Sequence, residues 1–177
     1  FALVAKSVPE TLEMLQGSQA NQRSTMRQIN DSGLRQLRGY QVEGALFCTG
    51  DPAPFPTMFT QQIKRRAAGG PGAFEEFIEE FRRRPVAYIV DSYRLGQFPA
   101  EVRQFLQTHY VRHSGALFIA GARVAAGATP QTADVIVPGD YRWIPASPNT
   151  ESLLHVGEQL VRPGGTVRLE PGQYRVQ

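Results

Sequence analysis

Two carboxylates stand directly after apolar runs of the sequence. Asp51 follows the run 45–49, and Asp91 follows the run 86–90. Open α/β sheets bind ligands outside the carboxyl ends of their strands, so Asp51 and Asp91 could together bind a cation or a sugar hydroxyl. Arg94, just beyond Asp91, joins them as a ligand-binding candidate. The simpler interpretation, which we favour, is that both aspartates cap turns by accepting backbone N–H bonds.

Three aromatic residues late in the chain form a second candidate group. Tyr141, Trp143 and Tyr174 lie in stretches where apolar and polar residues alternate, as they do on strands. Aromatic rings exposed on such strands can form a platform for a sugar ring, but aromatic residues on strands more often belong to a core. Both interpretations remain open for these three residues.

Other motifs with catalytic or metal-binding potential are weaker. His109 and His113 have the i, i+4 spacing of two metal ligands on one helix, but no neighbouring Glu, Asp or Cys offers a third ligand. The run 69–72 is rich in glycine but lacks the phosphate-loop pattern, and Cys48 lies inside an apolar run where a thiol is inert packing. We therefore predict no metal site, no cofactor and no catalytic constellation in these residues.

The elements that must position these residues alternate between strand and helix. Apolar positions 74, 77, 78 and 81 form one helical stripe, with glutamates early in the helix and arginines at its end. Pro85 ends this helix, and Pro99 begins another with an apolar stripe over 102–109. The apolar runs 45–49, 86–90 and 116–120 predict buried strands. The fold class predicted for residues 1–128 is therefore α/β, with a mainly parallel sheet covered by helices.

Residues 129–177 have a different pattern. The motif Pro-Gly-x-Tyr-Arg occurs at 138–142 and again at 171–175, each time after an apolar stretch. Pro-Gly is a turn dipeptide, and the residues after it alternate as strand residues do. We predict a second, small domain here: an antiparallel, sandwich-like β unit with two hairpins.

The composition of the chain excludes several classes of protein. At 177 residues, 41% hydrophobic and 20% charged, the chain is long and apolar enough to form one folded domain with an appendage. It has no apolar run near 18 residues and one cysteine, so neither a membrane span nor an intramolecular disulfide lies within it. Its net charge of +3 comes with short basic runs separated by glutamates, so nucleic acid is not an expected partner. Because residue 1 is Phe, we expect the chain to be cut from a longer protein.

The stretch 84–121 carries a set of familiar features. Arg84-Pro85 leads into an apolar strand that ends at Asp91, Pro99 opens a helix that reaches Tyr110, and a third apolar run reaches Gly121. Over about residues 10–125 the chain resembles the soluble tail of bacterial GT-C membrane glycosyltransferases, which include protein O-mannosyltransferases and the lipid A aminoarabinose transferase. The Pro-Gly-x-Tyr-Arg unit is similar to small β extensions at the ends of some of these chains.

The resemblance implies a parent that spans the membrane many times and transfers a sugar from a polyprenyl-phosphate donor with inversion. The family's catalytic acidic residues lie in an early extracytoplasmic loop outside this chain, so no catalytic residue is carried over. The resemblance therefore implies a non-catalytic domain on the periplasmic face of the inner membrane, packed on the membrane-embedded part of the parent chain. Its expected roles are to shape acceptor access, to contact a glycan or a polyprenyl-phosphate sugar, or to mediate assembly.

Two other functions remain as alternatives. One is a stand-alone carbohydrate-binding or cell-envelope interaction module that binds through the β unit. The other is a small α/β enzyme acting on a phosphorylated substrate, with Asp91 and the arginine-rich helix end at its site.

Overall fold

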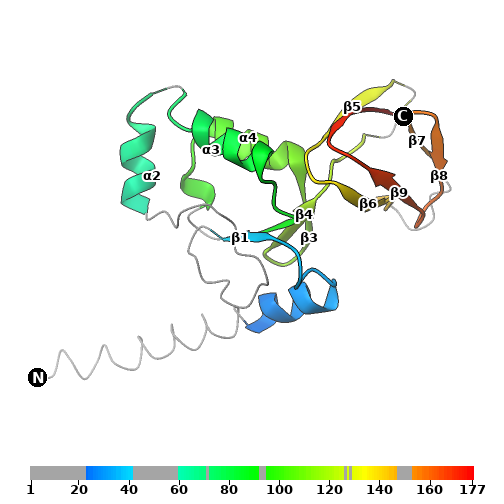
Figure 1. Cartoon of the computed structure of the whole chain (residues 1–177), viewed down its shortest axis with the longest axis horizontal. Helices are drawn as coiled ribbons and strands as arrows, with labels where there is room; N and C mark the ends of the chain where they lie inside the picture. Colours follow the sequence, from blue (N-terminus) through cyan, green and yellow to red (C-terminus); the bar gives the residue numbers. More distant parts are fainter. Residues whose placement is uncertain are drawn as a thin grey trace, which may run out of the picture.

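The computed structural model describes residues 23–41, 60–70, 72–91, 95–125, 127, 129–146 and 153–177. Two parts are visible side by side in Figure 1. Residues 23–125, here called the α/β part, contain a sheet and helices. Residues 131–177, the β unit, contain strands and turns. Among the described residues, no helix is long and apolar enough to cross a membrane.

The α/β part is built on one mixed sheet with the strand order β1-β2-β4-β3. β1 and β2 are parallel, whereas β4 is antiparallel to both β2 and β3. The predicted parallel sheet covered by helices is therefore wrong, because most of the strand pairs in this sheet are antiparallel. The four strands are Gly39–Gln41 (β1), Tyr88–Val90 (β2), Tyr110–Ser114 (β3) and Leu117–Ala120 (β4).

The direction of β4 explains this correction. A helix between two strands normally returns the chain to run parallel to the first strand. Here the chain leaves the helix directly into β3 and then turns back at Gly115, whose φ of 50° is in the left-handed region. β4 is thus the second arm of a β3–β4 hairpin and lies antiparallel beside β2.

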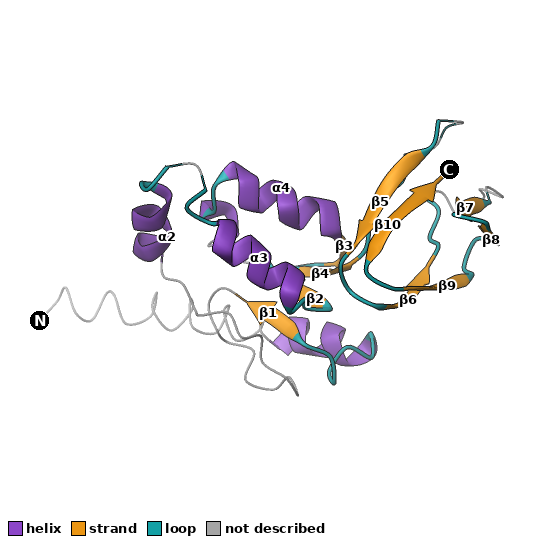
Figure 2. Ribbon diagram, turned by 45° about the horizontal axis from the view of Figure 1, so that its top comes forward, coloured by secondary structure: helices purple, strands orange, loops and turns teal. Residues whose placement is uncertain are grey.

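The helices agree better with the sequence. The two predicted from the apolar stripes are confirmed as α3 and α4, and they lie next to each other in Figure 2. The apolar runs 86–90 and 116–120 are confirmed as containing β2 and β4, while the run 45–49 lies outside the described residues. The helical segments are residues 23–31, Thr60–Ala67 (α2), Glu75–Arg83 (α3) and Ala100–His109 (α4), with a short 3-10 helix (η1) at Leu95–Gln97.

Strand β2 separates two apolar layers because successive side chains point to opposite faces. Ile89 packs among the rings of α3 and α4, whereas Tyr88 and Val90 pack with Ile29 of the helix at 23–31. β1 fits beside β2 because residue 39 is glycine: a Cβ there would lie 2.2 Å from the Tyr88 ring. The sheet thus has helices on both faces, although its strands are mostly antiparallel.

The β unit consists of two antiparallel sheets. The larger has the order β5-β10-β7-β8, and the smaller pairs β6 with β9. Its apolar core consists mainly of valines. Its strands are Gln131–Val135 (β5), Gly139–Arg142 (β6), Leu154–Val156 (β7), Gln159–Val161 (β8), Thr166–Leu169 (β9) and Gly172–Val176 (β10).

Candidate functional site

The two copies of Pro-Gly-x-Tyr-Arg are related by reciprocal strand pairing. The first copy connects β5 to β6, and the second connects β9 to β10. β5 pairs with β10 and β6 pairs with β9, so each arm of one copy pairs with an arm of the other. Each Pro-Gly is therefore a corner between the two sheets, whereas the sequence predicts a hairpin turn at each. In each copy, the strand before the Pro-Gly and the strand after it belong to different sheets, as strands at the corners of packed sheets do.

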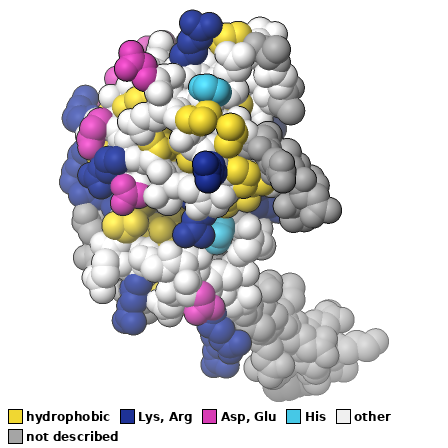
Figure 3. All heavy atoms as spheres, turned by 90° about the vertical axis from the view of Figure 1, so that its right-hand side faces the viewer, with side chains coloured by type: hydrophobic (Ala, Val, Ile, Leu, Met, Phe, Trp, Pro, Cys, Tyr) yellow, Lys and Arg dark blue, Asp and Glu magenta, His cyan; other side chains and the backbone are white. Residues whose placement is uncertain are grey.

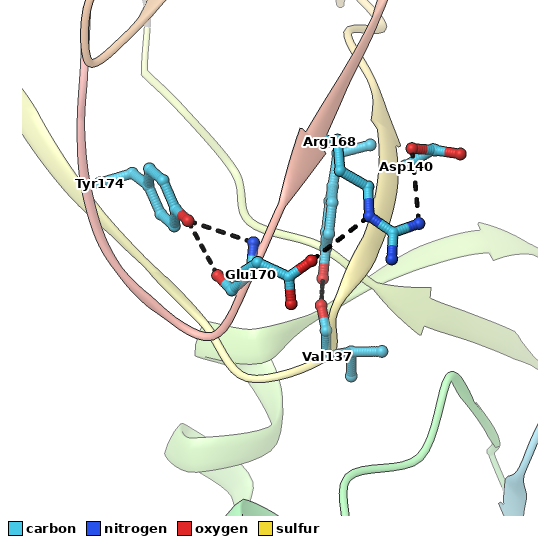
Figure 4. Close-up of polar contacts among 6 residues, drawn as sticks. Val137, Asp140, Arg168, Glu170 and Tyr174 are labelled. Carbon is cyan, nitrogen blue, oxygen red and sulfur yellow. Dashed lines mark hydrogen bonds and ion pairs between the residues drawn. The ribbon is translucent and has the colours of Figure 1, made fainter.

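The tyrosine of each copy closes its own corner. The Tyr141 hydroxyl donates to the Val137 carbonyl at 2.7 Å, and the Tyr174 hydroxyl donates to the Glu170 carbonyl at 3.0 Å. Each bond runs from the tyrosine to the residue before the proline of its copy, and Figure 4 labels Tyr174 and Glu170 of the second bond. These hydrogen bonds give the tyrosine of the motif a structural role at both positions, comparable to the tyrosine corner of other β-sandwiches.

Arg168 joins the two copies on the outside of the unit. Its guanidinium lies 3.8 Å from the carboxylate of Asp140, in the first copy, and 3.4 Å from the carboxylate of Glu170, the residue before the second copy. All three side chains are largely exposed, so these ion pairs contribute little to stability. Figure 4 shows Arg168 between the carboxylates of Asp140 and Glu170.

A cavity of about 90 Å³ opens between the two sheets of the β unit. Strands of both sheets line it, and most of the lining is aliphatic. We call it the aromatic hollow, because three of its lining residues are the predicted aromatic candidates Tyr141, Trp143 and Tyr174. Ligand sites are commonly apolar concavities with a few polar groups, and Arg142 is among the residues of this lining.

The three aromatic residues are held from the backbone as well as from the core. All three are partly buried and pack against the valine core. Trp143 exchanges backbone hydrogen bonds with the glycine turn opposite: its N–H donates to Gly165 at 2.9 Å, and its carbonyl accepts from Gly164 at 2.9 Å. Burial raises the pKa of Tyr141 to about 12, and the nearby Tyr174 phenol adds to this. The Tyr141 hydroxyl therefore remains a neutral donor at physiological pH.

Two charged or titratable side chains close the inner end of the hollow, where the β unit meets the α/β part. Both His109 at the end of α4 and Asp134 on β5 line the hollow. His109 Nε2 lies 3.0 Å from Asp134 Oδ2. Nothing in the sequence pairs these residues, because they are 25 positions apart and belong to different parts of the fold.

The remaining predicted site residues do not reach this hollow. Asp91 donates its backbone N–H to the Ala116 carbonyl at 2.7 Å, and its carboxylate lies 3.5 Å from Arg112. It directly follows β2 and is absent from the lining of the hollow. Asp51 and Arg94 lie outside the described residues, so their expected partnership with Asp91 has no structural counterpart here.

The arginine-rich end of α3 also lies apart from Asp91. Arg83 pairs with Glu80 at 2.9 Å within the helix, and Arg82 and Arg84 lie within 4 Å of Glu79 and Glu80. The arginines precede β2 and Asp91 follows it, so they stand at opposite ends of that strand. The structure does not bring together the residues on which the small-enzyme alternative depends.

The two histidines with helical spacing also separate. α4 ends at His109, and His113 lies on β3, where Nε2 is 3.1 Å from the Ser32 hydroxyl. Within the described ranges, no three His, Cys, Asp or Glu side chains gather as a metal site.

Exposed hydrophobic residues of the β unit lie outside the hollow. Figure 3 faces this end of the molecule and shows hydrophobic side chains among arginines and histidines. Ile144, Leu153 and Leu160 are between 45% and 65% exposed, and none of them lines the hollow. Leu160 therefore serves below as a surface control for changes inside it.

Comparisons of the whole chain with models of known families, with curated proteins and with solved structures found no match.

Proposed function

We propose that this chain is a non-catalytic extracytoplasmic domain of a membrane glycosyltransferase, and that its β unit binds carbohydrate of the acceptor. The observation that carries the binding proposal is the aromatic hollow, lined by Tyr141, Trp143 and Tyr174. The glycosyltransferase part of the proposal comes from the resemblance over residues 10–125.

The lining of the hollow suits one face of a sugar ring. A pyranose presents C–H groups on its faces and hydroxyls around its edge, so it packs on aromatic rings while its edge forms hydrogen bonds. Here the rings come with aliphatic neighbours, and Arg142 is also among the lining residues. Tyr141 and Tyr174 are positioned by their corner hydrogen bonds, which reduces the entropy lost when a ligand binds.

The α/β part suits the role of a scaffold. Most of the described part of the stretch on which the family resemblance rests forms β2, η1, α4, β3 and β4. The Tyr110 hydroxyl donates to the Val86 carbonyl at 3.0 Å, and the His109 carbonyl accepts from Gly121 at 2.9 Å. These hydrogen bonds connect the end of α4 to the residues next to the start of β2 and the end of β4. The β unit packs on this end of α4.

Glycan binding to Trp143→Ala tests the binding proposal. A glycan array selects a ligand for the wild-type chain, and calorimetry then compares affinities. We expect Trp143→Ala to weaken binding roughly tenfold, because it removes one aromatic face. Leu160→Ala, outside the hollow and 53% exposed, should bind like the wild type. Equal affinity of Trp143→Ala, or no binding of any glycan at millimolar concentration, would contradict the proposal.

The parent reading frame tests the membrane assignment separately. A hydrophobic multi-span sequence directly upstream is expected for a glycosyltransferase tail. A soluble upstream region together with glycan binding would instead favour the second candidate, a stand-alone carbohydrate-binding or cell-envelope module. The same aromatic hollow supports that candidate, so the reading frame decides between them.

A further inference from the structure

His109 is the last residue of α4 and is buried, with 4% of its surface exposed. Both ring nitrogens have a polar neighbour. Nδ1 lies 2.7 Å from the Phe105 carbonyl oxygen one turn earlier, and Nε2 lies 3.0 Å from Asp134 Oδ2 on β5. The ring therefore links the α/β part directly to the β unit.

The chemistry of the two partners fixes the number of protons at this link. A carbonyl oxygen can only accept, so Nδ1 must carry a proton. A carboxylate also only accepts, so Nε2 must carry a second proton unless Asp134 is itself protonated. In either arrangement one titratable proton lies between Nε2 and Oδ2. Without it, lone pairs would face each other across 3.0 Å.

We propose that this proton controls how firmly the β unit docks on α4. With the proton present, the link is a hydrogen bond, which is charge-assisted when Nε2 carries the proton, and its histidine side is inaccessible to solvent. Once the proton is lost, a buried imidazole nitrogen and a carboxylate repel each other, and the strand that carries Asp134 must move or admit water. The junction should therefore loosen as the pH rises.

The apolar part of the junction limits the size of this change. Ile136 and Val137, just beyond β5, pack with the aromatic core of the α/β part. That contact does not depend on pH, so losing the proton should open β5 locally rather than detach the β unit.

The other charged groups around His109 cannot supply the same pH dependence. Tyr141 remains neutral because burial raises the pKa of its phenol to about 12. The arginines keep their charge at every relevant pH. The Arg82 guanidinium carbon lies 5.4 Å from the centroid of the Phe105 ring, which is the ring next to His109. Four charged or titratable residues line the hollow together with His109: Asp134 on β5, Tyr141 and Arg142 on β6, and Tyr174 on β10. A fifth, Arg82 on α3, stacks on the neighbouring Phe105 ring.

Amide hydrogen exchange across pH 5.5–8.5 tests the proposal. After correction for intrinsic exchange, protection of β5 residues in the wild type should fall roughly tenfold as the pH rises, which is the effect of losing one hydrogen bond to a charged group. Asp134→Asn should remove the dependence, because an amide can either donate to a neutral ring or accept from a charged one. Asp140→Asn, an exposed carboxylate in the same unit, should behave like the wild type.

Two outcomes would overturn the proposal: protection of β5 that is independent of pH in the wild type, or the same pH dependence in Asp134→Asn. The chain has three histidines, so His113→Gln and His155→Gln serve as further controls and should keep the wild-type profile. Long-range ¹H–¹⁵N spectra of the His109 ring give an independent readout of its protons. The experiment needs no ligand, so its result is separate from that of the glycan-binding test.

Discussion

The two parts of the molecule fill their cores with different side chains. The α/β part packs aromatic rings: Tyr40, Phe77 and Phe81 lie edge to face or tilted, with centroids 5.0–6.1 Å apart. The β unit packs branched aliphatic residues, and all ten phenylalanines of the chain lie before it. Large rings fill the wide space between helices and a sheet, whereas valines suit short strands that lie close together.

This difference accounts for the place of the hollow. Valine side chains are short, so they line the space between the two sheets of the β unit without filling it. The aromatic residues of the β unit lie partly buried at the margin of the valine core. The α/β part thus keeps most of its aromatic rings inside its core, whereas the β unit leaves Tyr141, Trp143 and Tyr174 at the lining of the hollow.

The largest effect should come from removing a ring from the first core. Phe81 is fully buried and touches the rings of Tyr40, Phe77, Phe105 and Tyr110. Phe81→Ala should lower the free energy of unfolding by about 3–5 kcal/mol in urea denaturation. Val167→Ala in the second core should cost roughly 2 kcal/mol, because fewer atoms are lost. Equal costs would contradict this order, because the smaller deletion in the second core would then cost as much as the loss of a whole ring from the first.

An intermediate effect should come from the two corners. Tyr141→Phe removes a hydroxyl from a partly buried bond to Val137 and should cost about 1 kcal/mol of unfolding free energy. Tyr174→Phe should cost less, since its bond to Glu170 is exposed and water can replace the hydroxyl. The reverse order would mean that the second corner, not the first, holds the unit together.

Alkaline pH gives a second measurement on Tyr141. In the unfolded chain a tyrosine ionises near pH 10, whereas the folded Tyr141 keeps its proton until about 12. Its raised pKa therefore stabilises the fold fully below pH 10, and this contribution is lost between about pH 10 and 12. The free energy of unfolding of Tyr141→Phe, measured in urea at each pH, should fall less steeply than that of the wild type across this range.

The smallest effect should come from Asp91, the candidate that the structure places away from the hollow. Its ion pair with Arg112 is partly exposed at 3.5 Å, so Asp91→Asn should change the unfolding free energy by no more than about 0.5 kcal/mol. It should also leave glycan binding unchanged in calorimetry. A loss of binding would move the functional site from the β unit to the end of β2.

Local patterns predict individual elements well in this chain. The phenylalanine stripe and Pro85 specify α3, because helical periodicity and a proline stop depend on neighbouring residues alone. β1 and β3 have no such signal. β1 is three residues long and depends on the fit of Gly39 against Tyr88, and β3 alternates weakly and follows a helix without a break. The strand directions, and with them the fold class, depend on β3.

The candidate site is predictable to a lesser extent. Tyr141, Trp143 and Tyr174 can be found in the sequence because they are aromatic and lie in stretches where apolar and polar residues alternate. The corners can be found from the repeated motif. In both copies the tyrosine comes four residues after the residue whose carbonyl accepts its hydrogen bond. This spacing is the feature of the sequence that predicts the structural role of the tyrosine. The His109–Asp134 link has no sequence signal, because it exists only once β5 has docked on α4.

The reciprocal pairing of the two corners has a consequence for how the β unit folds. β7 and β8 pair across a tight turn and can form early, but β5 must wait for β10, which ends the described chain. β10 is also the central strand between β5 and β7. Contacts that far apart in sequence close slowly. During synthesis, β5 therefore emerges before its partner strand, and the larger sheet can close only after β10 has been made.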